Sequence, residues 1–239
     1  MFQALLKGKL APEEERLEDV LTSNVFGTLQ YFAIEDGLKL ILVNAIDEDG
    51  YFPFANKWNN ISNPNYLFWE PMNNHGCKPC VPDVLITMQQ SQGQNMIVLV
   101  ESKYRSGKSS FPDRGKLPND QLAREWHNLT KVADLEKSSP ILLYITDHFG
   151  FPKQEILESK KEFEKKVKLS KSPNIIWISW RKIPNIFVKS HHQILRDMVK
   201  VLQRQGLIFY EGIPYSQMLD IRWSYNKRLC RNPLLKDLV

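Results

Sequence analysis

The sequence predicts an α/β protein with a central mixed β-sheet and helices on both faces of the sheet. In the second half of the chain, segments with helical spacing alternate with short apolar runs. In the first half, two apolar runs joined by a polar linker indicate an antiparallel hairpin. We find no repeat with a period of about 20–50 residues. We therefore expect a single domain over residues 1–239, with an aromatic-rich insertion at 50–81 and a C-terminal extension at 207–239.

Composition excludes several classes of protein. The 239 residues are 42% hydrophobic and 25% charged, and no apolar run approaches the roughly 18 residues that span a membrane. Lysines close to the N-terminus do not fit a signal peptide. Three cysteines, an odd number, argue against a disulfide scaffold and favour a reducing, cytoplasmic location. The net charge of +5 makes a polyanionic partner plausible.

The first two expected elements lie before residue 50. Apolar residues recur at helical spacing after Pro12, from Leu17 to Phe32, and Gly27 weakens this helix or marks its end. The short run from Leu38 to Ile46 is rich in Ile, Val and Leu, which predicts a strand. Residues 50–81 contain four prolines and many aromatic side chains, which is typical of a long loop with its own aromatic cluster.

The remaining elements follow in a regular order. Two strands, Asp83 to Met88 and Met96 to Val100, form the expected hairpin. Asn119 or Asp120 can cap the next helix, whose apolar face is Leu122, Trp126, Leu129 and Ala133. Then come a strand over Ile141 to Ile145, a helix over 153–168 and a strand over Asn174 to Ser179. Ser190 can cap a last helix, which runs to Gln205 and stops at Gly206.

The hairpin carries the residues that suggest chemistry. Asp83 begins one strand and Glu101 ends the next, so the two carboxylates meet at one edge of the sheet. Lys103 is two residues after Glu101 and shares its face. Carboxylate oxygens suit Mg²⁺, which is held by one or two carboxylates together with substrate phosphate. The alternative is a solvated strand end with ordinary surface ion pairs.

These residues, Pro82-Asp83 followed by Glu101-Ser102-Lys103, resemble the motif of the PD-(D/E)XK nuclease superfamily. The resemblance covers about residues 12–146 and implies a restriction-endonuclease-like core that hydrolyses phosphodiesters with Mg²⁺ or Mn²⁺. It implies that Asp83, Glu101 and the Ser102 carbonyl are metal ligands and that Lys103 is the catalytic lysine.

Further site residues are implied by the same resemblance. Many members place a glutamate on the helix before the sheet. Here Glu15 and Glu18 are candidates and Glu14 is a weaker one. We favour Glu18, although all three could be solvated first-turn acids. Some members carry a glutamine on the helix after the lysine, with an aromatic residue one turn later. Gln121 fits the first feature, whereas Trp126 follows at five residues rather than four.

Two other groups of residues have weaker signals. The loop after Lys103 holds Arg105, Lys108, Arg114 and Lys116, which we expect to contact nucleic-acid phosphates. His75, Cys77 and Cys80 could begin a structural zinc site, although two cysteines in an aromatic loop are the simpler interpretation.

The functional expectation is a Mg²⁺-dependent endonuclease acting on DNA; RNA as substrate stays open. Because an unregulated nuclease endangers its host, we expect a restriction or anti-phage defence system, with a homodimer or a partner protein. The alternative is a catalytically silent subunit that binds nucleic acid or assembles a defence or repair complex.

Overall fold

A computed structural model describes residues 2, 6–7, 18–54, 64–89, 95–167 and 172–209. The chain divides into one unit, Met1–Phe209, and a second, Tyr210–Val239, which lies outside the described residues. Of the expected C-terminal extension, only residues 207–209 are therefore described. The candidates Glu14 and Glu15 also lie outside the described residues.

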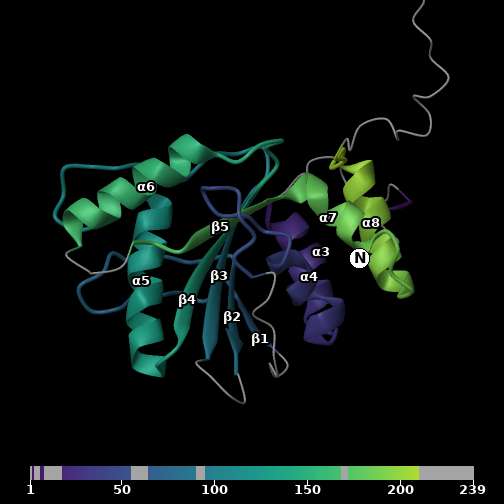
Figure 1. The fold of residues 1–239 in the computed structure, drawn as a ribbon, viewed down its shortest axis with the longest axis horizontal. Coiled ribbons are helices and arrows are strands. Elements are labelled where there is room, and N and C mark those ends of the chain that lie inside the picture. Colours follow the sequence, from purple (N-terminus) through teal and green to yellow (C-terminus); the bar gives the residue numbers. More distant parts are fainter. Residues whose placement is uncertain are drawn as a thin grey trace, which may run out of the picture. The chain divides into compact units, whose positions relative to one another are not determined.

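A five-stranded mixed sheet forms the centre of the first unit (Figure 1). Its strands are β1 (Asn65–Phe68), β2 (Val84–Met88), β3 (Met96–Lys103), β4 (Ser139–Thr146) and β5 (Ile175–Ser179), in that spatial order. The pairs β1–β2 and β2–β3 are antiparallel, whereas β3–β4 and β4–β5 are parallel. The predicted mixed sheet and the predicted hairpin are both confirmed.

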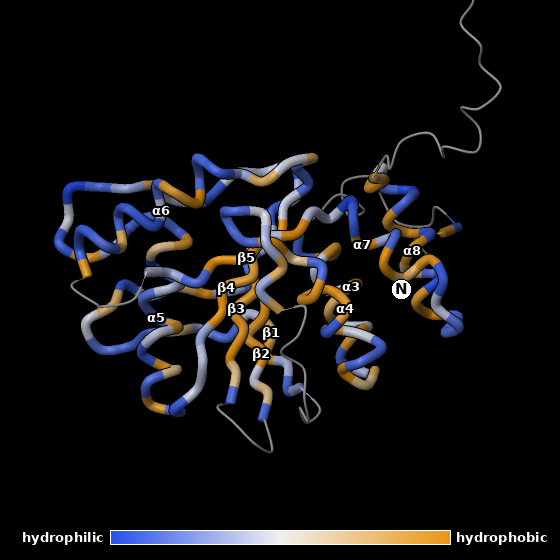
Figure 2. Tube along the Cα trace, viewed as in Figure 1, coloured by the Kyte–Doolittle hydropathy of each residue, from blue (hydrophilic) through white to orange (hydrophobic). Residues whose placement is uncertain are grey.

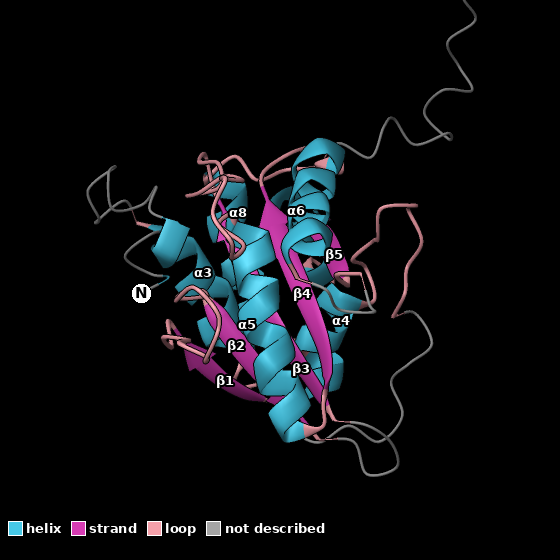
Figure 3. Cartoon of the chain, turned by 90° about the vertical axis from the view of Figure 1, so that its left-hand side faces the viewer, coloured by secondary structure: helices cyan, strands magenta, loops and turns pink. Residues whose placement is uncertain are grey.

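Helices cover both faces of this sheet (Figure 3). On one face lie α3 (Glu18–Leu29), α4 (Leu38–Leu42), α7 (Ile183–Phe187) and α8 (Gln193–Arg204). On the other lie α5 (Gln121–Glu136) and α6 (Lys153–Lys166). Short 3₁₀ turns occupy Ile34–Asp36 and Trp180–Lys182. The predicted α/β class is confirmed.

The central strand shows why both faces are covered. All eight residues of β3 are buried, and successive side chains point to opposite faces. Val98 and Val100 join the core beneath α3 and α8, whereas Ile97 and Leu99 join the core beneath α5. Figure 2 shows the strands as a band of apolar residues between more polar helices and loops. An apolar strand of this kind needs a helix on each side.

The strand predicted over Leu38 to Ile46 is wrong, because this run begins with helix α4. Leu38, Ile41 and Leu42 are all fully buried and have the i, i+3, i+4 spacing of one helix face. A short apolar run fits a buried helix as well as a strand, so its composition alone does not decide. Ile46 makes only an isolated antiparallel bridge, to Trp177 of β5.

The segment expected to be an irregular insertion contains strand β1, which the sequence did not predict. Tyr66 and Phe68 of β1 stack with ring centroids 6.4 Å apart, so some of the expected aromatic clustering is present. Residues 55–63 lie outside the described residues. β1 is short and half exposed, which leaves it without the long apolar run that marks the other strands.

Helix ends match the predictions unevenly. Asp120 caps α5, since its side chain accepts a hydrogen bond from the backbone of Ala123. Gly206 follows α8 with a φ of 79°, as expected for a helix stop. The predicted Ser190 cap is wrong: α8 begins only at Gln193, and the Ser190 hydroxyl instead accepts a hydrogen bond from the His192 backbone. Within the described segments, no helix combines the length and apolar character needed to cross a bilayer.

Candidate metal centre

The hairpin register brings Asp83 next to Glu101. Val84 of β2 pairs with Val100 of β3, so the residue before Val84 lies opposite the residue after Val100. β3 and β4 run in parallel, and Lys103 pairs with Thr146 at their common end. The motif residues are therefore gathered at the edge of the sheet where β3 and β4 end.

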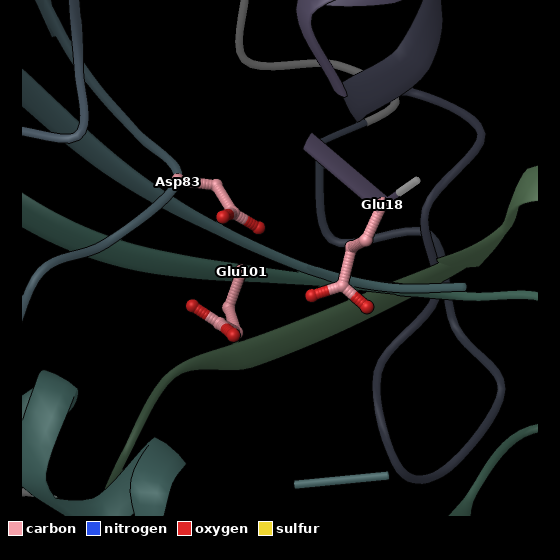
Figure 4. A group of neighbouring side chains, drawn as sticks. All are labelled: Glu18, Asp83 and Glu101. Atoms are coloured by element: carbon pink, nitrogen blue, oxygen red, sulfur yellow. The ribbon is translucent and has the colours of Figure 1, made fainter. Parts of the chain in front are cut away.

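Glu18 completes a group of three acids from three separate elements. It lies in the first turn of α3, and oxygens of Glu18, Asp83 and Glu101 all lie within 4.8 Å of one another. Figure 4 shows the three side chains near one another, each from a different segment of the chain. Among the described residues, this is the one group of three or more potential ligands close enough to hold a metal ion. The structure thus brings together the acids that the resemblance implies.

Lys103 bridges two of these acids. Its Nζ lies 2.7 Å from Oε1 of Glu101 and 3.0 Å from Oε1 of Glu18. The other oxygen of Glu18 accepts hydrogen bonds from the Tyr104 backbone at 2.9 Å and from the Ser106 hydroxyl at 2.5 Å. The loop after β3 therefore fixes the glutamate of α3 against the end of the sheet.

Asp83 is held through one of its two oxygens. The backbone N–H and the hydroxyl of Ser102 donate to Oδ2 at 2.8 Å and 2.7 Å. The Ser102 hydroxyl is also 2.6 Å from that of Thr22 on α3. Among the described residues, no hydrogen bond reaches Oδ1 of Asp83, so this oxygen is available to a ligand. The Ser102 side chain thus positions Asp83, in addition to the carbonyl role that the resemblance implies.

Gln121 faces the centre from the start of α5. Its Nε2 donates to Oε1 of Glu101, and its own Oε1 accepts from the Ser109 backbone at 2.7 Å. Trp126 is 3% exposed and packs in the core beneath α5, so it is a core residue. The side chain one helical turn after Gln121 that reaches the centre is Glu125.

Glu125 is the functional candidate that sequence reasoning missed. It is 1% exposed, and Glu101 is the charged residue that acts most strongly on its carboxyl group. Its Oε2 has no hydrogen-bond partner in the described structure. The signal in the sequence was the four-residue spacing from Gln121, which places both side chains on one helix face.

Burial and crowding of like charges raise the pKa values of the acids. Burial, and then the Asp83 charge, raise the pKa of Glu101 to about 7. Burial likewise raises the pKa of Asp83. Burial, and then the charge of Glu101, raise the pKa of Glu125 well above its ordinary range.

Lys103 responds in the opposite sense. Burial alone would lower the pKa of its ammonium group, but Glu101 and then Glu18 outweigh burial and raise it. Lys103 is therefore charged over the physiological pH range. The centre combines crowded, buried acids with the ammonium group of Lys103. A further positive charge nearby would stabilise the ionised form of each acid.

The expected phosphate contact by Lys108 does not fit the structure. Lys108 is 5% exposed, and its Nζ lies 2.5 Å from Oδ2 of Asp120 and 3.1 Å from the Ser159 hydroxyl. The ammonium group therefore holds α6 to the cap of α5. Arg105, Arg114 and Lys116 are exposed, so these three residues keep the expected availability to phosphate. Nothing in the local sequence showed that Lys108 would form a buried ion pair with Asp120 and so be unavailable to phosphate.

Replacing Lys108 by alanine is expected to destabilise the fold by about 3–5 kcal/mol, because it leaves the buried Asp120 carboxylate without its partner. Replacing the exposed Lys116 by alanine is expected to change the free energy of unfolding by less than about 0.5 kcal/mol. Urea denaturation of both variants measures the difference. Equal stability of the two variants would contradict the buried position of Lys108.

The Cys-x-x-Cys segment is better explained by packing than by zinc. Cys80 is buried, and its backbone forms a bridge with Met72. His75, Cys77 and Cys80 are all described, and they are not among the side chains that lie close enough together to hold one metal ion. The Cys77 sulfur is 3.7 Å from the His127 carbonyl. Both are free thiols.

Comparisons with protein-family models, curated proteins and solved structures give no match to this chain. The residues of the site are therefore the basis for a proposed function.

Proposed function

We propose that this chain is a divalent-metal-dependent nuclease with a restriction-endonuclease-like core. The observation that carries the proposal is the convergence of Glu18, Asp83 and Glu101 within 4.8 Å, with Lys103 against two of them. Support also comes from the order of elements: a helix with the first acid precedes an antiparallel hairpin with the other two, and a helix with Gln121 follows. The resemblance in sequence implies this same order.

The three acids fit a divalent cation of the Mg²⁺ or Mn²⁺ kind. Two oxygens on opposite sides of Mg²⁺ are about 4.2 Å apart, so oxygens within 4.8 Å of one another need only a small movement to share one ion. The free Oδ1 of Asp83 and the carboxylates of Glu101 and Glu18 would hold it, together with the Ser102 carbonyl. A cation held there supplies electrostatic stabilisation of the scissile phosphate and lowers the pKa of a water molecule.

The protein's own residues would prepare the site for this chemistry. Ser102 fixes the direction of the Asp83 carboxylate, while Gln121 fixes that of Glu101. Preorganised groups of this kind need no rearrangement during the reaction. Lys103, which its acidic neighbours keep charged, would neutralise negative charge that develops on the phosphate. This role suits the raised pKa of Lys103 better than proton abstraction does.

DNA is the substrate that we propose. The net charge of +5 and the exposed Arg105, Arg114 and Lys116 favour a polyanion. A cytoplasmic place in a restriction or anti-phage defence system, with a second copy or a partner protein to control cleavage, remains part of the proposal. The defence system and the controlling partner are proposed because an unregulated nuclease endangers its host.

One observation favours the alternative, a silent subunit that binds nucleic acid or assembles a complex. Lys103 already bridges Glu101 and Glu18. Acids neutralised in this way persist in a folded core without a metal ion. A protein of this kind would bind DNA but would not cut it.

Incubation of the full chain with plasmid DNA, with single-stranded DNA and with RNA, in Mg²⁺ or Mn²⁺, separates these functions. We expect metal-dependent cutting of DNA that stops on chelation and falls at least about 100-fold in Asp83→Asn. Asp134→Asn, which changes an exposed acid at the far end of α5, is the matched control and should cut normally. Equal cutting by Asp83→Asn would contradict the proposal, and binding without cutting would establish the alternative.

A further inference from the structure

Phe149 is an exposed aromatic residue at the end of the sheet that carries the candidate metal centre. It is 66% exposed and lies three residues beyond Thr146, the last residue of β4. Thr146 pairs with Lys103 on the neighbouring strand. Neighbouring strands are about 4.8 Å apart, and three residues extend at most about 11 Å. The Phe149 backbone is therefore within roughly 16 Å of that of Lys103.

Arg181 holds one face of the Phe149 ring. Its guanidinium carbon lies 4.2 Å from the ring centroid. The same guanidinium donates hydrogen bonds at 2.8 Å to the Asp147 carbonyl and at 2.8 Å to the Gly206 carbonyl. Arg181 is thus anchored at both ends of its planar group, and the ring lies against a fixed cation. One face of the Phe149 ring therefore contacts a cation, and the exposed side of the ring is a surface on which another flat ring can stack.

The segment that anchors Arg181 is also tied to the centre. The Tyr104 hydroxyl donates to the Gln205 carbonyl at 3.1 Å, next to the Gly206 carbonyl that Arg181 holds. Tyr104 itself follows Lys103, and its backbone N–H binds Glu18. Arg181, which contacts the Phe149 ring, is therefore linked through the backbone at residues 205–206 and through Tyr104 to Glu18.

An open depression of about 490 Å³ lies beside the backbone that flanks Phe149, and the ring itself is not part of its lining. It is lined by His148 and Gly150, the two neighbours of Phe149, and by Pro152, Lys153, Gln154, Glu155 and Glu158 at the start of α6. This volume lies within the range of small-molecule sites. Gln154 and Glu158 line it as a hydrogen-bonded pair, 3.0 Å apart, and so present a donor and an acceptor side by side. A nucleobase has polar edges of both kinds.

We propose that Phe149, backed by Arg181, is a stacking platform for a base of single-stranded nucleic acid that enters the metal centre. This role rests on the proposed function and deepens it, because it names the class of substrate that would bind at the same edge of the sheet. Stacking on an aromatic ring requires an unpaired base, because both faces of a base within a duplex are covered. The arginine behind the ring adds positive charge that suits the flanking phosphates.

The test measures binding without metal, so that it does not depend on cleavage. Fluorescence anisotropy of the full chain in EDTA compares a labelled 12-mer single strand with a duplex of the same sequence. Phe149→Ala is expected to weaken single-strand binding by about 5- to 100-fold and to leave duplex binding unchanged, whereas Phe149→Trp retains single-strand binding. Tyr31→Ala, at a ring that is 82% exposed beyond the far end of α3, is the matched control and should change neither.

The outcomes separate the two proposals. Unchanged single-strand binding by Phe149→Ala, or equal weakening of single strand and duplex, would overturn the platform even if the protein cuts DNA. A selective loss of single-strand binding would support the platform even if no metal-dependent cutting is observed. Circular dichroism of each variant establishes that the fold is intact.

Discussion

Replacing Lys103 by methionine is expected to lower metal-dependent cleavage by about 10²–10³-fold. Its ammonium group lies within 3.0 Å of both Glu101 and Glu18, so it lies where charge would develop on a bound phosphate. Methionine has a similar length without the charge. The single-turnover rate with plasmid DNA, at saturating Mg²⁺, measures the loss.

Two comparisons make this result specific to the centre. Lys161→Met removes an exposed charge from α6 and should leave the cleavage rate within a few-fold of wild type. Lys103→Met itself should still bind Mn²⁺, since carboxylates and not the ammonium group hold the ion. A Lys103→Met variant that cuts at the wild-type rate would exclude the proposed role of Lys103.

Divalent metal is expected to stabilise the folded chain strongly. An ion at about 100 times its dissociation constant adds about 2.7 kcal/mol to the free energy of unfolding. For a chain of this size, that gain raises Tm by about 5–10 °C. The physical reason is that burial and mutual repulsion already raise the pKa values of Asp83 and Glu101, so a cation relieves unfavourable charge in the folded state only.

Thermal unfolding with and without Mn²⁺ measures this shift. Glu101→Gln keeps the shape of the side chain but removes its charge, and we expect it to lose most of the metal-induced shift. Glu136→Gln, at the exposed last residue of α5, should retain the full shift. An equal shift in both variants would place the bound metal elsewhere on the chain.

The parts of the site that the sequence predicted are those fixed by local pairing. Asp83 and Glu101 begin and end two apolar runs joined by a short polar linker, so an antiparallel register is enough to bring them together. The helix with Gln121 was predictable in the same way, because Asp120 caps it and its apolar spacing is regular. In both cases the signal is contained in about 20 consecutive residues.

Features that depend on contacts between distant segments could not be predicted. Lys108 is unavailable to phosphate because its ammonium group contacts Asp120, the cap of α5, and Ser159 of α6. Glu125 acquires a role only because α5 lies against the end of β3. The run that starts at Leu38 becomes a helix because its buried face meets the core beneath α3. Tertiary packing decides each of these, and it overrides local propensity.

In the proposed function, Glu18, Asp83 and Glu101 hold a divalent metal ion. Diffraction from crystals grown with Mn²⁺, recorded for the anomalous signal of manganese, tests it directly. The proposal predicts a peak within about 2.5 Å of Oδ1 of Asp83 and of a Glu101 carboxylate oxygen. Saturating Mn²⁺ with no peak at these oxygens, and with Lys103 still bridging Glu101 and Glu18, would contradict it.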